Sequence, residues 1–470
     1  MLLGLPVTLQ SLISTFLWNT APDKPQTAAI TFQLRHHHGI SNNSRILFSD
    51  FQRDTSFLGY DSEFIIQTSR GSVARPKTLE AFTGSRRSRI MGLAPVVAWD
   101  DWEVPIPDVT KRSTLYQLAK MAGNSYFPDL NSSGWYDVSE GWKSNPHGWL
   151  PEDDGLRGHI FVSNDNTSVV ISIKGTSATW PVGEGGPTAP RDKLNDNMLF
   201  SCCCGRVGPT WSPVCGCYSG GYKCDENCID EALKDDGLFY PLGLNLYNNV
   251  SYLYPNANIW ITGHSLGGGL ASLMGTTFGA PVVAFEAPAE RRAWQRLHLP
   301  IPPSTKHITH VYNTADPIPQ GTCTGIASIC AIGGFALETK CHIGQVILYD
   351  TVSKLGWSVD ARSHPIKVVI DRLLSENADW KPEFNSESED GKEARRQHGW
   401  GWIPWPGKKH EDDPKEEPGT LREVPRARPA VEVEGEDGVC TDCFNWEYGS
   451  FQNLSVAVRP TGCGMASGGL

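Results

Sequence analysis

The chain has 470 residues, of which 39% are hydrophobic and 20% are charged, and its formal net charge is −11. This length can hold one large catalytic domain with appendages, and the composition is ordinary for a globular protein. The acidic balance excludes a nucleic-acid-binding protein, which needs a basic face to neutralise phosphates.

The first 22 residues carry no charged side chain, and Asp23 is the first charge. A run of this length can cross a bilayer, although Pro6 and Gln10 weaken it as a span. A cleaved signal peptide is the alternative, but no basic residue precedes the apolar run. We therefore predict a signal anchor at residues 1–22, which delivers the body of the chain into the secretory route.

Residues 23–110 are predicted to form a polar lumenal region with scattered short strands, such as 45–48 and 64–67. The stretch LRHHHG at 34–39 offers metal-ligand residue types, but three adjacent histidines cannot all face one ion from a regular element. We expect a solvated turn there. Five Asn-x-Ser/Thr sequences, which the secretory route can glycosylate, lie at Asn42, Asn131, Asn166, Asn249 and Asn453.

From residue 111 to 375 the pattern alternates between helices and strands, which is typical of an α/β domain. A helix is expected at 113–123, and a hairpin at 159–177 has the buried strand Ser168–Ile173 as its second arm. The later expected elements are a mixed apolar segment at 237–254, strands at 257–263, 281–288 and 306–317, and a helix at 267–279.

The chain has thirteen cysteines, and seven of them lie between Cys202 and Cys228 in a Cys-rich insertion at 200–230. This clustering is consistent with the secretory route. In an oxidising lumen such a cluster becomes a disulfide framework. Zinc is the alternative, with four thiolates at Cys215, Cys217, Cys224 and Cys228, but the spacing lacks paired C-x2-C knuckles. We predict disulfides, and the odd count leaves at least one thiol free or paired between chains.

Residues 376–436 are rich in charges, prolines and glycines, as in KKHEDDPKEEPG. Such a segment buries too little apolar surface to fold alone, so it is predicted to be a disordered linker. The tail at 437–470 contains the C-x2-C of Cys440 and Cys443, which is expected to close one small disulfide loop.

The pentapeptide from Gly263 to Gly267 fits G-x-S-x-G, the nucleophile elbow of serine hydrolases. A β-rich run leads into it and a helix of small residues follows it. The serine of an elbow lies on a strained turn, and the two glycines let strand and helix approach closely. A tight glycine turn without catalysis is the alternative, but these flanks favour Ser265 as a nucleophile.

A serine hydroxyl needs a histidine to take its proton and a carboxylate to hold the imidazole, and in elbow hydrolases both follow in the order Asp, His. Asp316, where a strand breaks at Pro317, is the best acid, ahead of Asp350 and Asp360. His364 lies in a loop before an amphipathic helix and is the predicted base. The other downstream histidines are His307, His310 and His342.

The tetrahedral intermediate also needs donors aimed at its oxyanion. The backbone N–H of Leu266, directly after the nucleophile, is the first candidate. The second is Thr176 in the KGTS sequence, which follows the predicted strand Ser168–Ile173 and offers both an N–H and a hydroxyl. A surface turn is the alternative reading of that loop.

GHSLGG after an aromatic-rich strand, with KGTS before it and NTADPIP after it, resembles the lipase-3 group of α/β-hydrolases. SCCCGRV, VCGCYSGGYKCDENC and VAFEAPAE resemble, more closely, the fungal autophagy-related lipases. The resemblance implies a phospholipid or triacylglycerol substrate and a triad of Ser265, Asp316 and His364. It also implies that the residue matching Thr176 helps form the oxyanion hole and that a lid follows it at 178–200.

The resemblance further implies a single-pass type II protein that passes through the ER, Golgi and multivesicular bodies to the vacuole lumen, where it dismantles autophagic bodies. We therefore predict an α/β-hydrolase that hydrolyses acyl esters of membrane lipids through an acyl-enzyme, with no cofactor and no metal. A secreted carbohydrate or cutin-type esterase is the alternative enzyme, since it would share the triad without the anchor. A glycosylated cell-surface binding protein is the non-enzymatic alternative.

Overall fold

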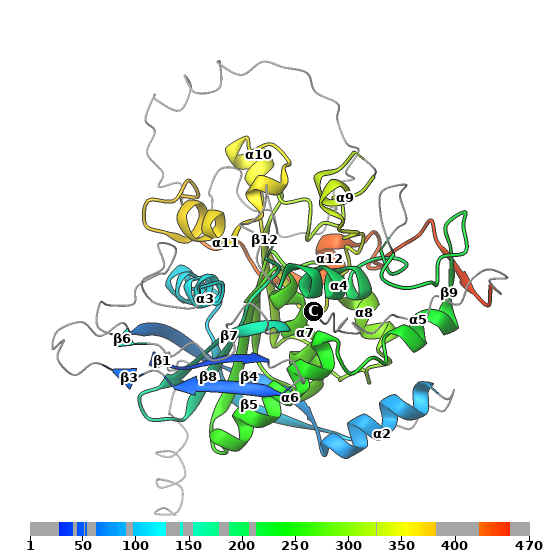
Figure 1. Ribbon diagram of the computed structural model, residues 1–470. Helices are drawn as coiled ribbons and strands as arrows, with labels where there is room; N and C mark the ends of the chain where they lie inside the picture. The colour runs from blue at the N-terminus through cyan, green and yellow to red at the C-terminus, as the bar shows by residue number, and fades with distance from the viewer. Residues whose placement is uncertain are drawn as a thin grey trace, which may run out of the picture.

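The structure is a computed structural model (Figure 1). It describes residues 28–40, 45–50, 52–53, 63–90, 97–127, 142–143, 154–177, 188–205, 213–325, 327–381 and 423–451. The predicted anchor at residues 1–22 lies outside these ranges. Within them, no helix combines the length and apolar character that crossing a membrane requires.

Eleven of the described strands form one mixed sheet, in the order β14-β13-β12-β11-β10-β8-β7-β1-β4-β5, with β2 paired to β1. Its central strands β8, β10, β11, β12 and β13 are parallel, whereas β7, β1, β4 and β5 pair antiparallel. The strands of this sheet are β1 Ala28–Ile40, β2 Ile46–Asp50, β4 Phe64–Pro76, β5 Trp99–Pro107, β7 Asp154–Ser163, β8 Ser168–Ile173, β10 Asn258–His264, β11 Val282–Phe285, β12 Ile308–Asn313, β13 Gln345–Tyr349 and β14 Arg428–Pro429. Two short pairs stand apart: β3 Gln52–Arg53 with β6 Trp142–Lys143, and β9 Lys223–Asp225 with β15 Glu447–Gly449.

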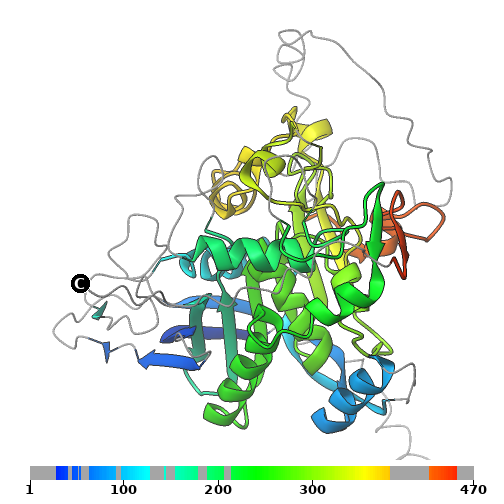
Figure 2. The same cartoon turned by 45° about the vertical axis from the view of Figure 1, so that its right-hand side comes forward.

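Helices cover both faces of this sheet, which gives three layers (Figures 1 and 2). One face packs against α3 Arg112–Asn124, α11 Ile366–Val368 and the π-helical turn η2 Val369–Leu374. The opposite face packs against α4 Ala189–Leu199, α6 Phe239–Leu253 and α7 Leu266–Phe278. The remaining helices are α2 Leu79–Ile90, α5 Glu226–Ala232, α8 Arg291–Arg296, α9 Ile329–Gly333, α10 Thr351–Leu355, the 3-10 turn η1 Ala361–Ser363 and α12 Ala430–Glu434. Parallel strands with helices on both sides are the arrangement expected of an α/β-hydrolase.

The parallel strands are buried on both faces, which explains their continuous apolar runs. Every residue of β8 and β11 is buried, and so is every residue of β12. Helix α7 lies directly on this sheet and is buried along almost its whole length. It ends at Gly279, whose φ of 61° is the left-handed conformation that glycine adopts most easily. The predicted α/β alternation is therefore confirmed.

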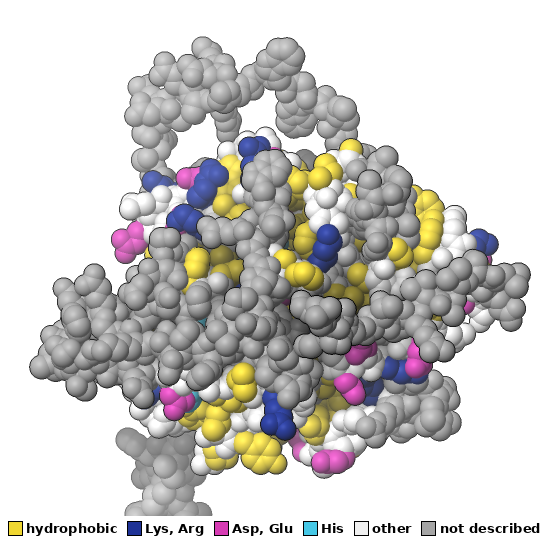
Figure 3. Space-filling view, in the orientation of Figure 1, with side chains coloured by type: hydrophobic (Ala, Val, Ile, Leu, Met, Phe, Trp, Pro, Cys, Tyr) yellow, Lys and Arg dark blue, Asp and Glu magenta, His cyan; other side chains and the backbone are white. Residues whose placement is uncertain are grey.

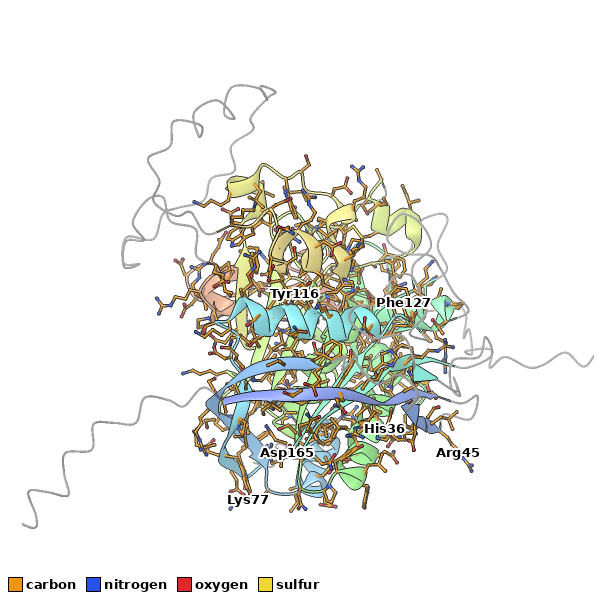
Figure 4. All side chains as sticks on the ribbon, turned by 90° about the vertical axis from the view of Figure 1, so that its left-hand side faces the viewer. His36, Arg45, Lys77, Tyr116, Phe127 and Asp165 are labelled. Carbon is orange, nitrogen blue, oxygen red and sulfur yellow. A yellow bond between two sulfur atoms is a disulfide. The ribbon has the colours of Figure 1, made fainter. Side chains whose placement is uncertain are left out.

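The prediction of a solvated turn at 34–39 is wrong. These residues lie inside the long strand β1, on which Figure 4 labels His36, and His37 and His38 are buried where β1 pairs with β2 and β7. The imidazole of His38 donates to the carbonyl oxygen of Ser172 at 3.0 Å, and His37 hydrogen-bonds His159 at 2.7 Å. The strand predicted at 45–48 corresponds to β2, and the one predicted at 64–67 is the start of the long strand β4. β1, β2, β4 and β5 all belong to the main sheet, so these strands are not scattered.

The cysteines form six disulfides within the described residues, which confirms the predicted disulfide framework. The pairs are Cys202–Cys443, Cys203–Cys224, Cys204–Cys215, Cys217–Cys228, Cys323–Cys330 and Cys341–Cys440. The predicted small loop between Cys440 and Cys443 is wrong, because each pairs with a distant cysteine of the α/β domain. Cys463 lies outside the described residues.

The C-terminal segment 423–451, which we call the strap, packs against the domain beside the Cys-rich insertion (Figure 2). Its strand β14 pairs with β13, and β15 pairs with β9. Most of the predicted linker, 382–422, lies outside the described residues. The part at 423–436 is ordered, because two disulfides and the sheet edge hold a segment that could not fold alone.

Candidate active site

Ser265 lies at the junction of β10 and α7 with φ of 56° and ψ of −130°. A positive φ is strained for a residue with a Cβ, and such strain at a strand-to-helix turn is what a nucleophile elbow requires. A Cβ on Gly263 would lie 2.5 Å from the backbone of Gly267, and one on Gly267 would lie 2.3 Å from the carbonyl oxygen of Ile173. Any larger residue at Gly263 or Gly267 would collide with backbone atoms, so both positions require glycine.

The structure brings the three predicted triad residues together. The Oγ of Ser265 lies 2.9 Å from Nε2 of His364, and Nδ1 of His364 lies 2.6 Å from Oδ2 of Asp316. All three side chains are buried, with exposed fractions of 7%, 2% and 0% for Ser265, His364 and Asp316. Asp316 also accepts at Oδ1 from the backbone N–H of Ile318 at 2.9 Å. A carboxylate, an imidazole and a hydroxyl thus form one chain of hydrogen bonds.

His264, which precedes the nucleophile, holds the loop that carries His364. Its Nε2–H donates to the carbonyl oxygen of His364 at 2.8 Å, so its Nδ1 accepts from the hydroxyl of Tyr126 at 2.7 Å. Burial, with the charge of His364 as a second cause, keeps the pKa of His264 well below its usual range. A neutral imidazole of defined tautomer therefore links the end of α3, close to Phe127 in Figure 4, to the histidine loop.

The KGTS loop, which carries the predicted oxyanion residue Thr176, lies beside Ser265. A Cβ on Gly175 would lie 3.1 Å from the Cβ of Ser265 and 2.1 Å from the hydroxyl oxygen of Tyr126, so only glycine fits. Thr176 follows, and among the described residues its backbone N–H has no hydrogen-bond partner. Its hydroxyl donates to Oδ2 of Asp196 at 2.5 Å. The backbone N–H is thus the open donor of Thr176.

A buried ion pair fixes the same loop to α4. Nζ of Lys174 donates to Asp192 at 2.9 Å, and the backbone N–H of Ser177 donates to the same carboxylate at 2.9 Å. Burial lowers the pKa of Lys174, although Asp192 opposes this shift. Burial also raises the pKa of Asp196 to about 8, against the hydrogen bond from Thr176. Buried side chains, chiefly Lys174, Asp192 and Asp196, therefore join the KGTS loop to the described part of the predicted lid.

The competing acids have local structural roles. Asp350 caps α10 by accepting from the N–H of Ser353 at 3.1 Å, and Asp360 accepts from the N–H of Arg362 at 2.8 Å. Neither contacts a histidine in the described structure. The competing histidine His307 is buried against the carbonyl oxygen of Gly275 at 3.2 Å.

His310 and His342 belong to a second buried cluster, in which Glu290, His310 and His342 lie close enough to hold a metal ion. Both nitrogens of His342 are engaged, however, with Glu434 at 2.5 Å and with the carbonyl oxygen of Ala287 at 2.9 Å. An imidazole that donates from both nitrogens has no lone pair for a metal. We therefore interpret the cluster as a buried network of charged groups, which holds α12 of the strap in place through Glu434.

Asn166 and Asn249 are the predicted glycosylation sites that fall on described residues. Asn166 is exposed in the turn between β7 and β8, with φ of 57°, and Asn249 is exposed on α6. Asn42, Asn131 and Asn453 lie outside the described residues, as does the first part of the predicted lid at 178–187.

Sequence reasoning missed three residues at this site: Tyr126, His264 and Glu286. Glu286 is fully buried directly after β11 and is hydrogen-bonded to the side chain of Asp316. Its signal was visible in the stretch VAFEAPAE, where a carboxylate follows a buried apolar strand. Parallel strands place such positions along one edge of the sheet, where ligand sites form.

The sheet order, the strained serine between strand and helix, and the hydrogen-bonded acid, base and hydroxyl define this chain as an α/β-hydrolase. Residues 245–280, which span the elbow, match the family model described as Lipase (class 3). The chain is 41% identical to the "Putative lipase ATG15" of Mycosarcoma maydis, over 91% of this chain and 86% of the relative. It is 39% identical to the protein of the same name from Cryptococcus neoformans var. neoformans serotype D (strain JEC21), over 95% and 99%. The chain belongs to the ATG15 family of lipases.

Solved fungal lipases are similar to it at lower identity. The Lip2 lipase of Yarrowia lipolytica is 15% identical, with a TM-score of 0.26 over 50% of this chain and 78% of that one. A triacylglycerol lipase from Penicillium expansum is 14% identical, with a TM-score of 0.29 over 51% and 80%.

Proposed function

We propose that this lipase cleaves acyl esters of membrane lipids through Ser265, with His364 as general base and Asp316 as its carboxylate partner. The observation that supports this most directly is the 2.9 Å approach of the Ser265 hydroxyl to His364, at a strained elbow. Each group has the position that its step requires.

The proposed reaction has two halves. His364 takes the proton of Ser265 as the hydroxyl attacks the ester carbonyl, and Asp316 stabilises the imidazolium that forms. The N–H groups of Leu266 and Thr176 donate to the oxyanion, and the N-terminus of α7 adds its positive end. His364 then protonates the departing alcohol. Water repeats the sequence on the acyl-enzyme and releases a fatty acid.

A packed lipid surface is the substrate that suits the sequence and the family. The carboxyl ends of the parallel strands meet at the edge of the sheet where α9 and α10 lie (Figure 1). Ile332 of α9 is 75% exposed and Val359, after α10, is 58% exposed. Figure 3 shows apolar side chains interspersed with Lys and Arg at this end of the molecule. Such a mixed surface is compatible with lipid head groups and acyl chains.

The cellular location of the protein is part of the proposal. The uncharged residues 1–22 would anchor the chain in a membrane of the secretory route, with the catalytic domain in the lumen. Disulfides suit an oxidising lumen. The name of the relatives supports a role in autophagy, in which vacuolar lysis of autophagic bodies would require hydrolysis of their membrane lipids.

The test is fatty-acid release from phospholipid vesicles and from triacylglycerol emulsions by the full-length protein and by Ser265→Ala. We expect the variant to lose roughly a thousandfold or more of the activity, because Ser265 carries the one hydroxyl that hydrogen-bonds the His364 ring among the described residues. Ser353→Ala is the matched control, since Ser353 is exposed on α10 away from the candidate triad. Full activity of Ser265→Ala would show that the serine assignment is wrong.

The same assay separates the alternatives. Faster turnover of soluble short-chain or feruloyl esters than of vesicles would favour a carbohydrate or cutin-type esterase. Comparison of phospholipid vesicles with triacylglycerol separates phospholipase from neutral-lipid lipase activity. Failure of the wild type to react with a fluorophosphonate probe would favour a binding protein that keeps only the fold.

A further inference from the structure

Glu286 is a buried carboxyl group for which the reaction of Ser265 has no direct use. It follows β11 with φ of 43°, is 0% exposed, and donates its backbone N–H to the carbonyl oxygen of Val311 at 3.0 Å. A non-glycine residue in this conformation is strained, and such strain persists where surrounding contacts fix the side chain. The contacts of Glu286 show what fixes it.

Asn313 determines which role the Glu286 oxygens can play. The amide oxygen of Asn313 accepts from the N–H of Ala315 at 3.0 Å and from the hydroxyl of Thr351 at 3.1 Å. Its amide nitrogen must therefore face Glu286, and it donates to Oε1 at 2.8 Å. Oε1 of Glu286 is thus an acceptor, and Oε2 accepts a longer hydrogen bond from the backbone N–H of Asn313 at 3.4 Å. The carboxyl group also hydrogen-bonds the side chain of Asp316.

Two carboxyl groups in a buried hydrogen bond share one proton, because two adjacent buried anions repel each other. Asp316 faces His364 and the N–H of Ile318, both donors that favour its charged form. Burial, and then the charge of Asp316, raise the pKa of Glu286 well above its usual range. The proton of the pair therefore resides on Glu286.

The other titratable group that faces Glu286 is the phenol of Tyr312, on the neighbouring strand β12. Burial, and then the charge of Glu434, raise the pKa of Tyr312 well above its usual range, with Glu286 contributing in the same direction. The hydroxyl of Tyr312 donates to Glu434 at 2.8 Å, away from the candidate triad. No described cation is among the groups that interact with Glu286. The two hydrogen bonds from Asn313 favour its charged form, but burial and the charge of Asp316 outweigh them.

We propose that Glu286 is a positioning residue of the candidate triad, a neutral carboxylic acid that donates a hydrogen bond to Asp316 and keeps the triad active at acidic pH. The inference rests on the proposed function of Ser265, His364 and Asp316. The bond holds the Asp316 carboxylate in the plane of His364. It also draws negative charge away from the oxygen that faces the imidazole, so a lower pH is needed before His364 is lost as a base.

The experiment measures the second-order rate of Ser265 labelling by a fluorophosphonate from pH 4.5 to 9.5, in full-length wild type, E286Q and E286L. Glutamine can accept from Asn313 and donate to Asp316, as a protonated glutamate does. We expect E286Q to keep the rate within about threefold. It should also keep the position of the acid limb, which is the part of the pH profile where the labelling rate falls as the pH decreases. E286L should lose roughly tenfold of the rate and move its acid limb up by roughly 0.5 to 1 pH unit.

The labelling rate at alkaline pH is a second measurement, and it does not require E286L to fold. Wild type should lose labelling rate where Glu286 loses its proton, whereas E286Q has no proton to lose and should stay flat over that range. The matched control is E290Q, because Glu290 is equally buried four residues later but bonds Ser272 and His310 instead of the candidate triad. Its acid limb should coincide with that of wild type.

A shift of the E286Q acid limb as large as that of E286L would overturn the inference, because it would show that an ionised carboxylate is needed. Equal alkaline losses in wild type and E286Q would overturn it as well. Absence of labelling at Ser265 in wild type is a different result, which would refute the proposed function. Labelling of wild type with identical profiles in all variants would leave the triad intact and reject only the role of Glu286.

Discussion

Replacing His38 with glutamine should weaken the protein at neutral pH but make its stability less sensitive to acid. The imidazole of His38 is 1% exposed in β1, and its Nε2–H donates to the carbonyl oxygen of Ser172 at 3.0 Å. A glutamine amide can replace that donor without carrying a proton that titrates. The variant therefore separates the hydrogen bond from the titration.

The size of the effect follows from proton linkage. Burial, opposed by the bond to Ser172, lowers the pKa of His38 from about 6.5 to about 4. Because the folded pKa is the lower one, the stabilising contribution is complete above pH 6.5 and is lost as the pH falls towards 4. Between pH 7 and pH 5 this removes about 2 kcal/mol of unfolding free energy. Burial lowers the pKa of His159 to about 3, which adds a similar loss.

The assay is urea unfolding, followed by tryptophan fluorescence with the disulfides intact, at pH 7 and pH 5. His38→Gln should lose about 2 kcal/mol less than wild type between the two conditions, because the other buried histidines titrate in both proteins. Thr68→Val is the control, because it removes a buried hydrogen bond to Ala28 in the same sheet without a titrating group. Equal pH-dependent losses in wild type and His38→Gln would refute the reasoning.

Two further substitutions test the elbow and the strap. Gly267→Ala places a methyl group 2.3 Å from the carbonyl oxygen of Ile173, so we expect at least a tenfold drop in fluorophosphonate labelling, and unchanged labelling would contradict it. Glu434→Gln removes the carboxylate that, against the effect of burial, helps raise the pKa of His342 to about 9. It should cost about 3 kcal/mol in urea unfolding at pH 6 and less at pH 9.5, because this contribution is present below pH 6.5 and lost as the pH rises through 9. An equal cost at both values would exclude the ion pair.

The elbow was predictable because its requirements are local. A strand, a strained serine and a helix follow one another in the chain, and the glycines that permit the contact stand two residues either side of Ser265. The order of acid and base was predictable for a related reason, since each follows a parallel strand and all such strands end at one edge. Asp316 and His364 meet there in the structure.

The errors concern partners that are distant in sequence. The histidines of β1 look like a polar turn, because the carbonyl of Ser172 that receives His38 lies 134 residues later. Cys440 and Cys443 look like one small loop, because neighbours in sequence are the nearest candidates. The partners of Cys440 and Cys443 are 99 and 241 residues away, and they come close only when the strap packs against the domain. Pairing of this kind cannot be deduced from spacing.

Glu286 and the buried histidines of β1 and β7 respond to pH in opposite directions. His38 and His159 favour the folded state as neutral imidazoles, so acid withdraws part of their contribution to stability. Glu286 favours its neutral form, so alkali withdraws the proton that it donates to Asp316. A shift from neutral to mildly acidic pH therefore lowers the unfolding free energy while it preserves the proposed carboxyl pair. His38→Gln should therefore lose less stability than wild type between pH 7 and pH 5 and leave the acid limb of Ser265 labelling in place, whereas E286L should move that limb.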